Sequence, residues 1–345
     1  MYRHYKSVGQ ERWNGRGPLL VAGMIALLAG GALAAGPARD TPTTEAPPTS
    51  VLLVTLDTTR ADHLGAYGDV AARTPNLDAL ARRGMRFARC DTAAPVTLVS
   101  HATILTGLYP PRHGVRDNGT FTLPSKVETV AERFAAAGRD TAAVVSSVVL
   151  ARRHGLDQGF ARYDDDLGAG YAAGTEVAER TADVATDRAL ELLSTLRPGF
   201  LLWVHYYDAH EEYRPPDRLV RGKGTTALYD GEIEFVDEQF GRLLAALPAN
   251  TAVVVVGDHG EMLGEHGEAT HGLLLYSGVR RVPLIVAGPG ALSGETVDCL
   301  VRTADVAPTL LALMGLPQPK AMTGHSLLNG STRHGEAKRR VSAAA

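Results

Sequence analysis

Wholly apolar runs alternate along this chain with segments in which apolar residues recur at helical spacing. The apolar runs predict strands, and the amphipathic segments predict helices. The expected strands are 51–56, 140–147, 199–205, 251–257 and 282–287, and the expected helices are near 74–84, from around Val99, 126–137, 174–195, 227–245 and 305–314. Because strands without a polar face are typical of a sheet covered on both sides, we expect an α/β fold with a parallel or mixed sheet.

Two of the expected strands end in residues that bind metal ions. Strand 51–56 leads into Asp57, and strand 251–257 leads into Asp258 and His259. Open α/β sheets place their chemistry at the carboxyl ends of strands. Two carboxylates and an imidazole suit a hard or borderline divalent cation, although an Asp at a strand end can also cap the next helix or turn.

The composition excludes several kinds of protein. The net charge of −3, with no dense basic run outside the extreme termini, makes nucleic acid an unexpected partner. Only Cys90 and Cys299 are present, which allows one disulfide but excludes a disulfide framework and a thiolate metal site. We interpret both cysteines as small buried apolar side chains.

The N-terminus has the layout of an export signal. Four basic residues precede an apolar stretch at 18–35, which contains an Ala-Leu-Ala cleavage candidate at 32–34. The stretch is also long enough to anchor the chain in a bilayer. Either version places the protein outside the cytoplasm, in the periplasm or another extracytoplasmic space. We expect it to be soluble if the signal is cleaved, and anchored by residues 18–35 if it is not. The expected organisation is a signal peptide or anchor at 1–35, a Pro/Thr-rich linker at 36–50, a catalytic domain at 51–330 and a polar tail at 331–345.

The segment 94–118, with the sequence APVTLVSHATILTGLYPPRHGVRDN, resembles the nucleophile segment of the sulfatase family within the alkaline phosphatase superfamily. Further resemblances follow in the family's order: LDTTRADHLG from Leu56, YYDAH from Tyr206, GDHGEMLGEHG from Gly257, RVPLI from Arg281 and DVAPTL from Asp305. The resemblance covers most of 50–330. It implies an alkaline-phosphatase-like sandwich, with a mostly parallel central sheet between helical layers and a shortened C-terminal subdomain.

The resemblance places Thr97 where sulfatases carry the Cys or Ser that becomes formylglycine. The family pattern there is Cys-x-Pro-x-Arg, whereas this chain has Thr97, Val99 and His101. Threonine cannot become formylglycine, so a covalent ester on Thr97 has no aldehyde exit and must be cleaved by water at the central atom. Water attack is the ordinary second half of phosphoryl transfer through a covalent intermediate. Alternatively, Thr97 is simply a helix N-cap.

The expected metal ligands are Asp57, Asp258, His259 and Thr97, around Ca, Mn, Mg or Zn. A metal ion is needed because a free threonine hydroxyl is too weak an acid to attack at neutral pH. The number of ions stays open at one or two.

The resemblance also implies substrate contacts. His210 follows the strand 199–205, and His271 lies near the position of a sulfatase Lys that faces the anion. In one arrangement both contact the substrate of a single-ion site; in the other, Asp208, His210 and His271 hold a second ion.

A Lys and a His that sulfatases carry after the strand near 144–145 are absent, because this chain has Ser146 and Ser147 there. Candidate substitutes are His101, Arg116 and Asn118, each of which can instead brace the nucleophile loop.

These patterns favour an exported, metal-dependent hydrolase or transferase that cleaves phosphate or phosphonate esters, and less readily sulfate esters, through a Thr97 intermediate. The substrate is a small-molecule, lipid or glycan ester. A conventional sulfuric ester hydrolase is the first alternative. An inactive, metal-retaining binding protein is the second, and the complete set of Asp57, Thr97, Asp258 and His259 speaks against it.

Overall fold

The computed structural model describes residues 50–168, 179–291 and 293–328. The chain divides into two units, Met1–Thr43 and Thr44–Ala345, and the described residues all belong to the second. The expected export signal, nearly all of the linker and the polar tail lie outside them.

Within the described ranges, we find no helix with the length and apolar character needed to cross a bilayer.

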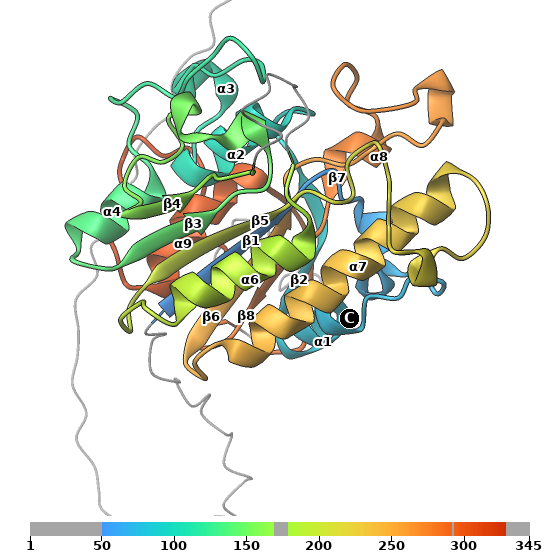
Figure 1. Ribbon diagram of the computed structural model, residues 1–345. Helices are drawn as coiled ribbons and strands as arrows, with labels where there is room; N and C mark the ends of the chain where they lie inside the picture. Colours follow the sequence, from blue (N-terminus) through green and yellow to red (C-terminus); the bar gives the residue numbers. More distant parts are fainter. Residues whose placement is uncertain (1–49, 169–178, 292, 329–345) are drawn as a thin grey trace, which may run out of the picture. The chain divides into compact units, whose positions relative to one another are not determined.

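A mixed sheet of nine strands forms the centre of the described chain (Figure 1). Its order is β4-β3-β5-β1-β6-β8-β2-β7, and β9 also pairs with β2. Strands β4, β3, β5, β1 and β6 are parallel, and β8 runs antiparallel to β6. The strands are β1 Ser50–Leu56, β2 Met85–Asp91, β3 Thr141–Val144, β4 Arg162–Asp164, β5 Leu201–Tyr206, β6 Thr251–Gly257, β7 Arg281–Val282, β8 Leu284–Ala287 and β9 Glu295–Arg302.

Helices cover both faces of the sheet. On one face lie α1, α6 and α7, and on the other lie α2, α4 and α9 (Figure 1). The helices are α1 Pro75–Arg83, α2 Thr97–Thr106, α3 Pro110–His113, α4 Val130–Ala136, α6 Ala182–Leu193, α7 Thr225–Ala246, α8 Ser277–Arg280 and α9 Val306–Leu313. The expected α/β sandwich with a mostly parallel central sheet is confirmed.

Strand β1 shows why its sequence is apolar on both faces. Val51 and Leu53 belong to the core beneath α2, α4 and α9, whereas Leu52, Val54 and Leu56 belong to the core beneath α1, α6 and α7. A central strand between two helical layers has no solvated side, so alternation of polar and apolar residues is lost.

The pattern of apolar residues misses β2, β4 and β9. Strand β9, with the sequence ETVDCLVR, is exposed along most of its length, and β2 carries charged residues between buried ones. Strand β3 ends at Val144, earlier than expected. Helix α6 begins at Ala182, and the first five residues of the helix expected at 174–195 lie outside the described residues. Cys90 and Cys299 are free thiols; Cys90 is buried and Cys299 only partly so.

The register of the parallel strands positions the candidate site. Leu56 at the end of β1 pairs with Tyr206 at the end of β5 and with Gly257 at the end of β6. The next residue of each strand therefore emerges at the same edge of the sheet, where Asp57 and Asp258 lie.

Candidate active site

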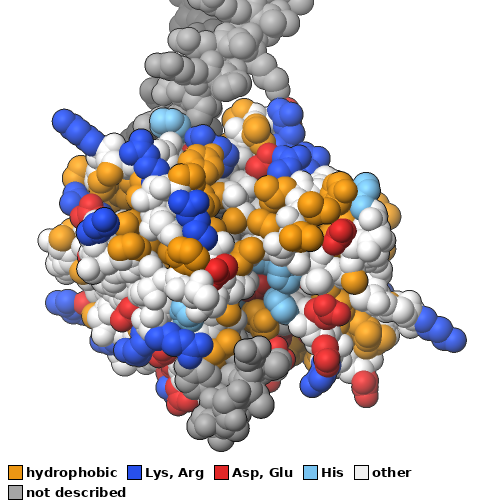
Figure 2. Space-filling view, turned by 90° about the horizontal axis from the view of Figure 1, so that it is seen from above, with side chains coloured by type: hydrophobic (Ala, Val, Ile, Leu, Met, Phe, Trp, Pro, Cys, Tyr) orange, Lys and Arg blue, Asp and Glu red, His pale blue; other side chains and the backbone are white. Residues whose placement is uncertain are grey.

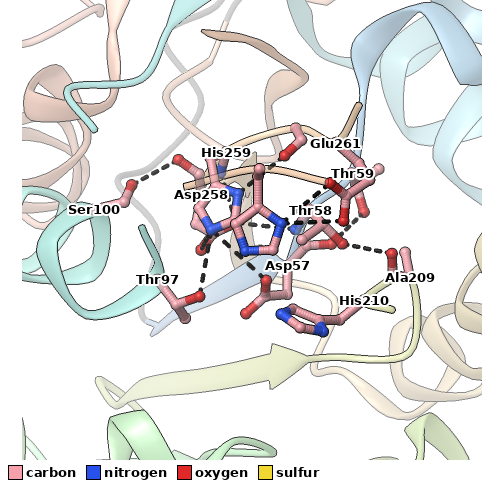
Figure 3. A network of polar contacts seen from close by, with 12 residues as sticks. Asp57, Thr58, Thr59, Thr97, Ser100, Ala209, His210, Asp258, His259 and Glu261 are labelled. Atoms are coloured by element: carbon pink, nitrogen blue, oxygen red, sulfur yellow. Dashed lines mark hydrogen bonds and ion pairs between the residues drawn. The ribbon is translucent and has the colours of Figure 1, made fainter. Parts of the chain in front are cut away.

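A buried group of three side chains lies at this edge of the sheet. Asp57, Asp258 and His259 each bring one ligand atom within 4.8 Å of the other two. All three are fully buried or nearly so, and Figure 3 shows them with Thr97 beside the group. Elsewhere in the described ranges, no other three His, Cys, Asp or Glu side chains come together in this way.

Each of the two carboxylates has one bonded oxygen and one free oxygen. Oδ2 of Asp57 lies 3.0 Å from Nε2 of His205, and Oδ1 of Asp258 accepts the backbone N–H groups of Thr58 and His259, at 3.2 and 2.6 Å. Oδ1 of Asp57 and Oδ2 of Asp258 are buried without a hydrogen-bond partner. Because a buried polar atom without a partner is costly, these two oxygens fit a bound cation that would supply the missing interaction.

The pKa values of the two acids also favour a bound cation. Burial raises the pKa of Asp57, but the hydrogen bond and charge of His205 outweigh burial and hold that pKa below its usual range. Burial and the charge of Asp57 raise the pKa of Asp258 well above its usual range. Two buried carboxylates repel each other unless a proton or a cation lies between them.

His259 presents an unprotonated nitrogen to the same point. Its Nδ1 donates to the carbonyl of Gly260 at 3.0 Å, so Nε2 carries the lone pair. Nε2 lies 3.4 Å from Oδ2 of Asp258 and 3.9 Å from Oδ1 of Asp57. Burial lowers the pKa of His259 to about 3, which keeps the imidazole in the neutral form that binds metals.

Thr97 faces this nitrogen from the first turn of α2. Its Oγ1 lies 3.3 Å from Nε2 of His259, and the side chain is buried. Val96 is the N-cap residue, and neither it nor Thr97 caps the helix through a side-chain hydrogen bond. Asn118 performs that function, because its Oδ1 accepts the backbone N–H of Leu98 at 2.8 Å. The Thr97 hydroxyl is therefore free for chemistry.

His101 lies fully buried one turn further along α2. Its Nδ1 donates to the carbonyl of Thr97 at 2.8 Å and lies 3.5 Å from Oδ2 of Asp258. Its Nε2 accepts from the hydroxyl of Thr55 at 3.0 Å, and that hydroxyl oxygen accepts from Nε1 of Trp203 at 2.9 Å. Burial lowers the pKa of His101 to about 3, so the ring is neutral. His101 is thus a brace of the nucleophile segment, one of the two roles that the sequence left open.

His205 is the site residue that sequence reasoning missed. It lies in β5, and the register places it beside Thr55 of β1. The backbone N–H of Ser146 donates to its Nδ1 at 3.3 Å, so Nε2 carries the hydrogen that faces Asp57. The hydroxyl of Ser146 also donates to the carbonyl of His205, at 2.6 Å. In the sequence, only the presence of one histidine in an otherwise apolar strand pointed to this role.

His271 and His210 line the more exposed side of the site. The ring of His271 lies 4.5 Å from that of His259 and 5.0 Å from that of His210, between centroids. Nδ1 of His271 lies 3.1 Å from Oε2 of the buried Glu261. Burial lowers the pKa of His271, but the hydrogen bond and charge of Glu261 outweigh it and raise that pKa overall. A raised pKa favours a positive charge on the imidazole, which suits contact with an anionic substrate. Figure 2 shows histidine side chains near the middle of the face seen from above.

Asp208 is engaged elsewhere. Its Oδ1 accepts the backbone N–H of Ala182, the first residue of α6, at 2.9 Å. Burial raises its pKa to about 7. Burial and the charge of Asp208 raise the pKa of Glu232 to about 8. In the described ranges Asp208, His210 and His271 do not come together as a ligand group, whereas Asp57, Asp258 and His259 do.

The other two candidate substitutes lie at the border of the site. Arg116 is exposed, and Asn118 braces the start of α2 as described above. Neither makes a described hydrogen bond to Asp57, Asp258 or His259.

Comparisons with known proteins match most of the described chain. The Sulfatase family model matches residues 49–316. An arylsulfatase of Clostridium perfringens is 25% identical over 81% of this chain and 77% of its own length. The steryl-sulfatase of Mus musculus is 28% identical over 90% and 69%. Among solved structures, the phosphonate monoester hydrolase of Agrobacterium radiobacter has a TM-score of 0.68 at 22% identity, over 86% of this chain and 83% of that one.

Proposed function

This chain belongs to the sulfatase family of ester hydrolases, and we propose that it cleaves phosphate or phosphonate esters through a covalent intermediate on Thr97. One observation carries the proposal: the Thr97 hydroxyl lies beside the Asp57, Asp258 and His259 group. The motif resemblance assigns the formylglycine position to the same residue. The protein is a hydrolase if water removes the bound group from Thr97, and a transferase if another alcohol does so.

The residues that fit a metal ion are Asp57, Asp258, His259 and Thr97. A divalent cation bound there would lower the pKa of a contacting hydroxyl and polarise a substrate oxygen. Its affinity would depend on the free oxygens of Asp57 and Asp258 and on Nε2 of His259.

The chemistry needs two displacements at phosphorus. In the first, Oγ1 of Thr97 bonds to phosphorus, the bond from phosphorus to the alcohol oxygen breaks, and the hydroxyl proton leaves with the alcohol. In the second, a water oxygen bonds to phosphorus, the bond to Thr97 breaks, and the threonine hydroxyl regains a proton. His271 is held by Glu261, which raises its pKa and so favours a positive charge facing the substrate anion.

Two residues favour phosphorus over sulfur. Thr97 lacks the aldehyde exit that lets formylglycine expel sulfate by breaking a C–O bond. Ser146 is buried and bonded to His205, so it does not replace the sulfatase Lys that contacts the anion. The similar phosphonate monoester hydrolase indicates that this fold accommodates phosphorus esters.

The decisive assay compares p-nitrophenyl phosphate, p-nitrophenyl phenylphosphonate and p-nitrophenyl sulfate with Ca, Mg, Mn and Zn in turn. We expect a higher kcat/KM for the phosphorus esters and a phosphoryl group on the Thr97 peptide after acid quenching, detected by mass spectrometry. A preference of the unmodified protein for the sulfate ester would refute the proposal and restore the conventional sulfatase as the better reading.

We also propose that the protein acts outside the cytoplasm. The support is the basic N-terminus followed by the apolar stretch at 18–35. A reporter enzyme that is active only after export, fused after Ser50, should be active, and the same fusion without residues 1–35 should be inactive. Equal activity of both fusions would contradict this.

A further inference from the structure

The loop that follows His271 presents large apolar side chains to solvent. Leu273 is 80% exposed, Leu274 42% and Leu275 48%. Tyr276, 38% exposed, continues this run, whereas the other exposed large apolar side chains of the described chain, Val70, Val184 and Leu300, stand singly in the sequence. A contiguous exposed apolar run beside polar groups is typical of a binding surface.

Both ends of this loop are held in place. At one end, His271 is bonded to Glu261. At the other, the Tyr276 ring stacks on the His266 ring, with centroids 4.1 Å apart and planes at 16°. The carbonyl of Tyr276 also accepts the backbone N–H groups of the first turn of α8. The leucines are therefore exposed between fixed points.

The reaction geometry directs the leaving group toward this loop. In a displacement at phosphorus, the attacking and leaving oxygens lie roughly in line. Thr97 supplies the attacking oxygen, and in the view of Figure 3 Thr97 and His210 lie on opposite sides of Asp57. The His210 ring contacts the His271 ring, and Leu273 lies two residues further along the chain. The alcohol would leave on the side where the leucines begin.

We propose that Leu273, Leu274 and Leu275 bind the apolar alcohol of the ester, so that the substrate is amphiphilic, with an anionic ester head and an alkyl or ring-bearing alcohol. The inference rests on the proposed function and names its substrate class. A lipid bilayer is the less suitable occupant. Glu265 on the preceding turn is paired with Arg60, but Glu268 beside it is partly exposed, and its charge opposes contact with an anionic membrane surface.

A homologous series of n-alkyl phosphates, from methyl to octyl, tests the proposal, because the leaving-group pKa changes little along the series while the apolar length grows. Complete transfer of a methylene out of water is worth about fourfold in affinity, and a surface that covers one side of the chain gives roughly twofold. We expect kcat/KM to rise by roughly twofold per methylene over the first several carbons, chiefly through KM.

The test variant is Leu273→Ser with Leu275→Ser. It should flatten the chain-length dependence, so that kcat/KM for octyl phosphate falls by a larger factor than kcat/KM for methyl phosphate. Leu300→Ser, on the edge strand β9 and 55% exposed, is the matched control and should keep the dependence. A steep dependence that survives in the double variant, or a flat dependence in the unmodified protein, would overturn the proposal.

Binding measured without turnover separates this inference from the proposed function. Thr97→Ala protein should bind octyl phosphate more tightly than methyl phosphate by calorimetry, and the two leucine substitutions should remove the difference. If no ester is hydrolysed but this difference is found, the proposed function fails and the apolar surface stands. If the unmodified protein sediments with phosphatidylcholine vesicles in a Leu273-dependent manner while the alkyl series is flat, the surface binds membrane and our assignment is wrong.

Discussion

Oγ1 of Thr97 and Nε2 of His259 lie 3.3 Å apart, although 162 residues separate them in the chain. Because Nδ1 of His259 donates to Gly260, Nε2 is the acceptor of this pair and the hydroxyl is the donor. The same oxygen and nitrogen are two of the expected metal ligands. The first turn of α2 thus places the Thr97 hydroxyl directly against the group formed by Asp57, Asp258 and His259.

Removal of the Thr97 hydroxyl should abolish turnover without unfolding the protein. Thr97→Ala should lower kcat/KM by about a thousandfold or more, since no other described hydroxyl touches Nε2 of His259. Thr97→Ser keeps the hydroxyl and should retain part of the activity. Steady-state kinetics on p-nitrophenyl phosphate measure this, with thermal melting as the folding control. Substantial activity in Thr97→Ala would exclude Thr97 as the nucleophile.

Metal should reverse the effect of Asp258→Asn on stability. Without metal, burial and Asp57 raise the pKa of Asp258, so ionised Asp258 weakens the fold above its unfolded pKa of about 3.9. Asp258→Asn removes that charge and should raise the Tm at pH 8 in a chelator. With saturating metal, only the unmodified protein should gain about 3–4 kcal/mol, the gain expected at several hundred times Kd. Melting curves of both proteins, with chelator and with metal, measure the Tm difference in each condition. A lower Tm of Asp258→Asn in chelator would contradict the destabilising effect of ionised Asp258.

The hydroxyl of Thr55 should matter for the placement of Thr97. Thr55→Val removes the hydroxyl that bonds to both Trp203 and His101, at nearly constant side-chain volume. It leaves Nε1 of Trp203 and Nε2 of His101 buried without hydrogen-bond partners. We expect a loss of about 1–3 kcal/mol in the free energy of unfolding and a fall in kcat. Thr103→Val is the control. Thr103 is buried like Thr55 and lies in the same helix as Thr97, but its hydroxyl bonds to Val99 and His113 and not to His101.

Urea unfolding and kinetics distinguish the two variants. Both should lose stability, and only Thr55→Val should lose turnover. An equal fall in kcat for both would mean that the Thr55 and His101 contacts serve stability alone.

The buried acids Asp208 and Glu232 should make the protein less stable as the pH rises from about 4 to about 8. Their pKa values are raised to about 7 and 8 in the fold, so between these limits the folded chain holds protons that the unfolded chain has released. Stability is therefore lost as the pH rises, by at most about 1.4 kcal/mol per pH unit for each proton.

The double variant Asp208→Asn, Glu232→Gln should show a shallower decline of unfolding free energy across this range. Glu191→Gln, an exposed acid on α6, is the control and should keep the full slope. Parallel slopes for all three proteins would show that neither buried acid titrates in this window.

The central strands and the metal group could be predicted from sequence because they depend on local pattern. The apolar runs of β1 and β6 give their bounds to within one residue, and parallel strands end at one edge, which brings Asp57 and Asp258 together. Strands β2 and β9 could not be predicted in this way, because their charged residues at the sheet's border remove the apolar signal.

The partners of the site residues depend on register and on loop paths, which spacing does not encode. His205 reaches Asp57 only because β5 pairs with β1. Asp208 has the residue type and spacing of a ligand, yet its carboxylate bonds to the start of α6.

The position of β1 has a consequence for the order of events when the chain is made. It is the first strand of the sheet in sequence, but its neighbours β5 and β6 are synthesised much later, and Asp258 follows Thr58 by 200 residues. A chain that emerges from its amino end holds Asp57 as a single carboxylate until β6 has joined the sheet. The group that could hold a metal ion is therefore complete only in a late step of folding, which also closes the centre of the sheet.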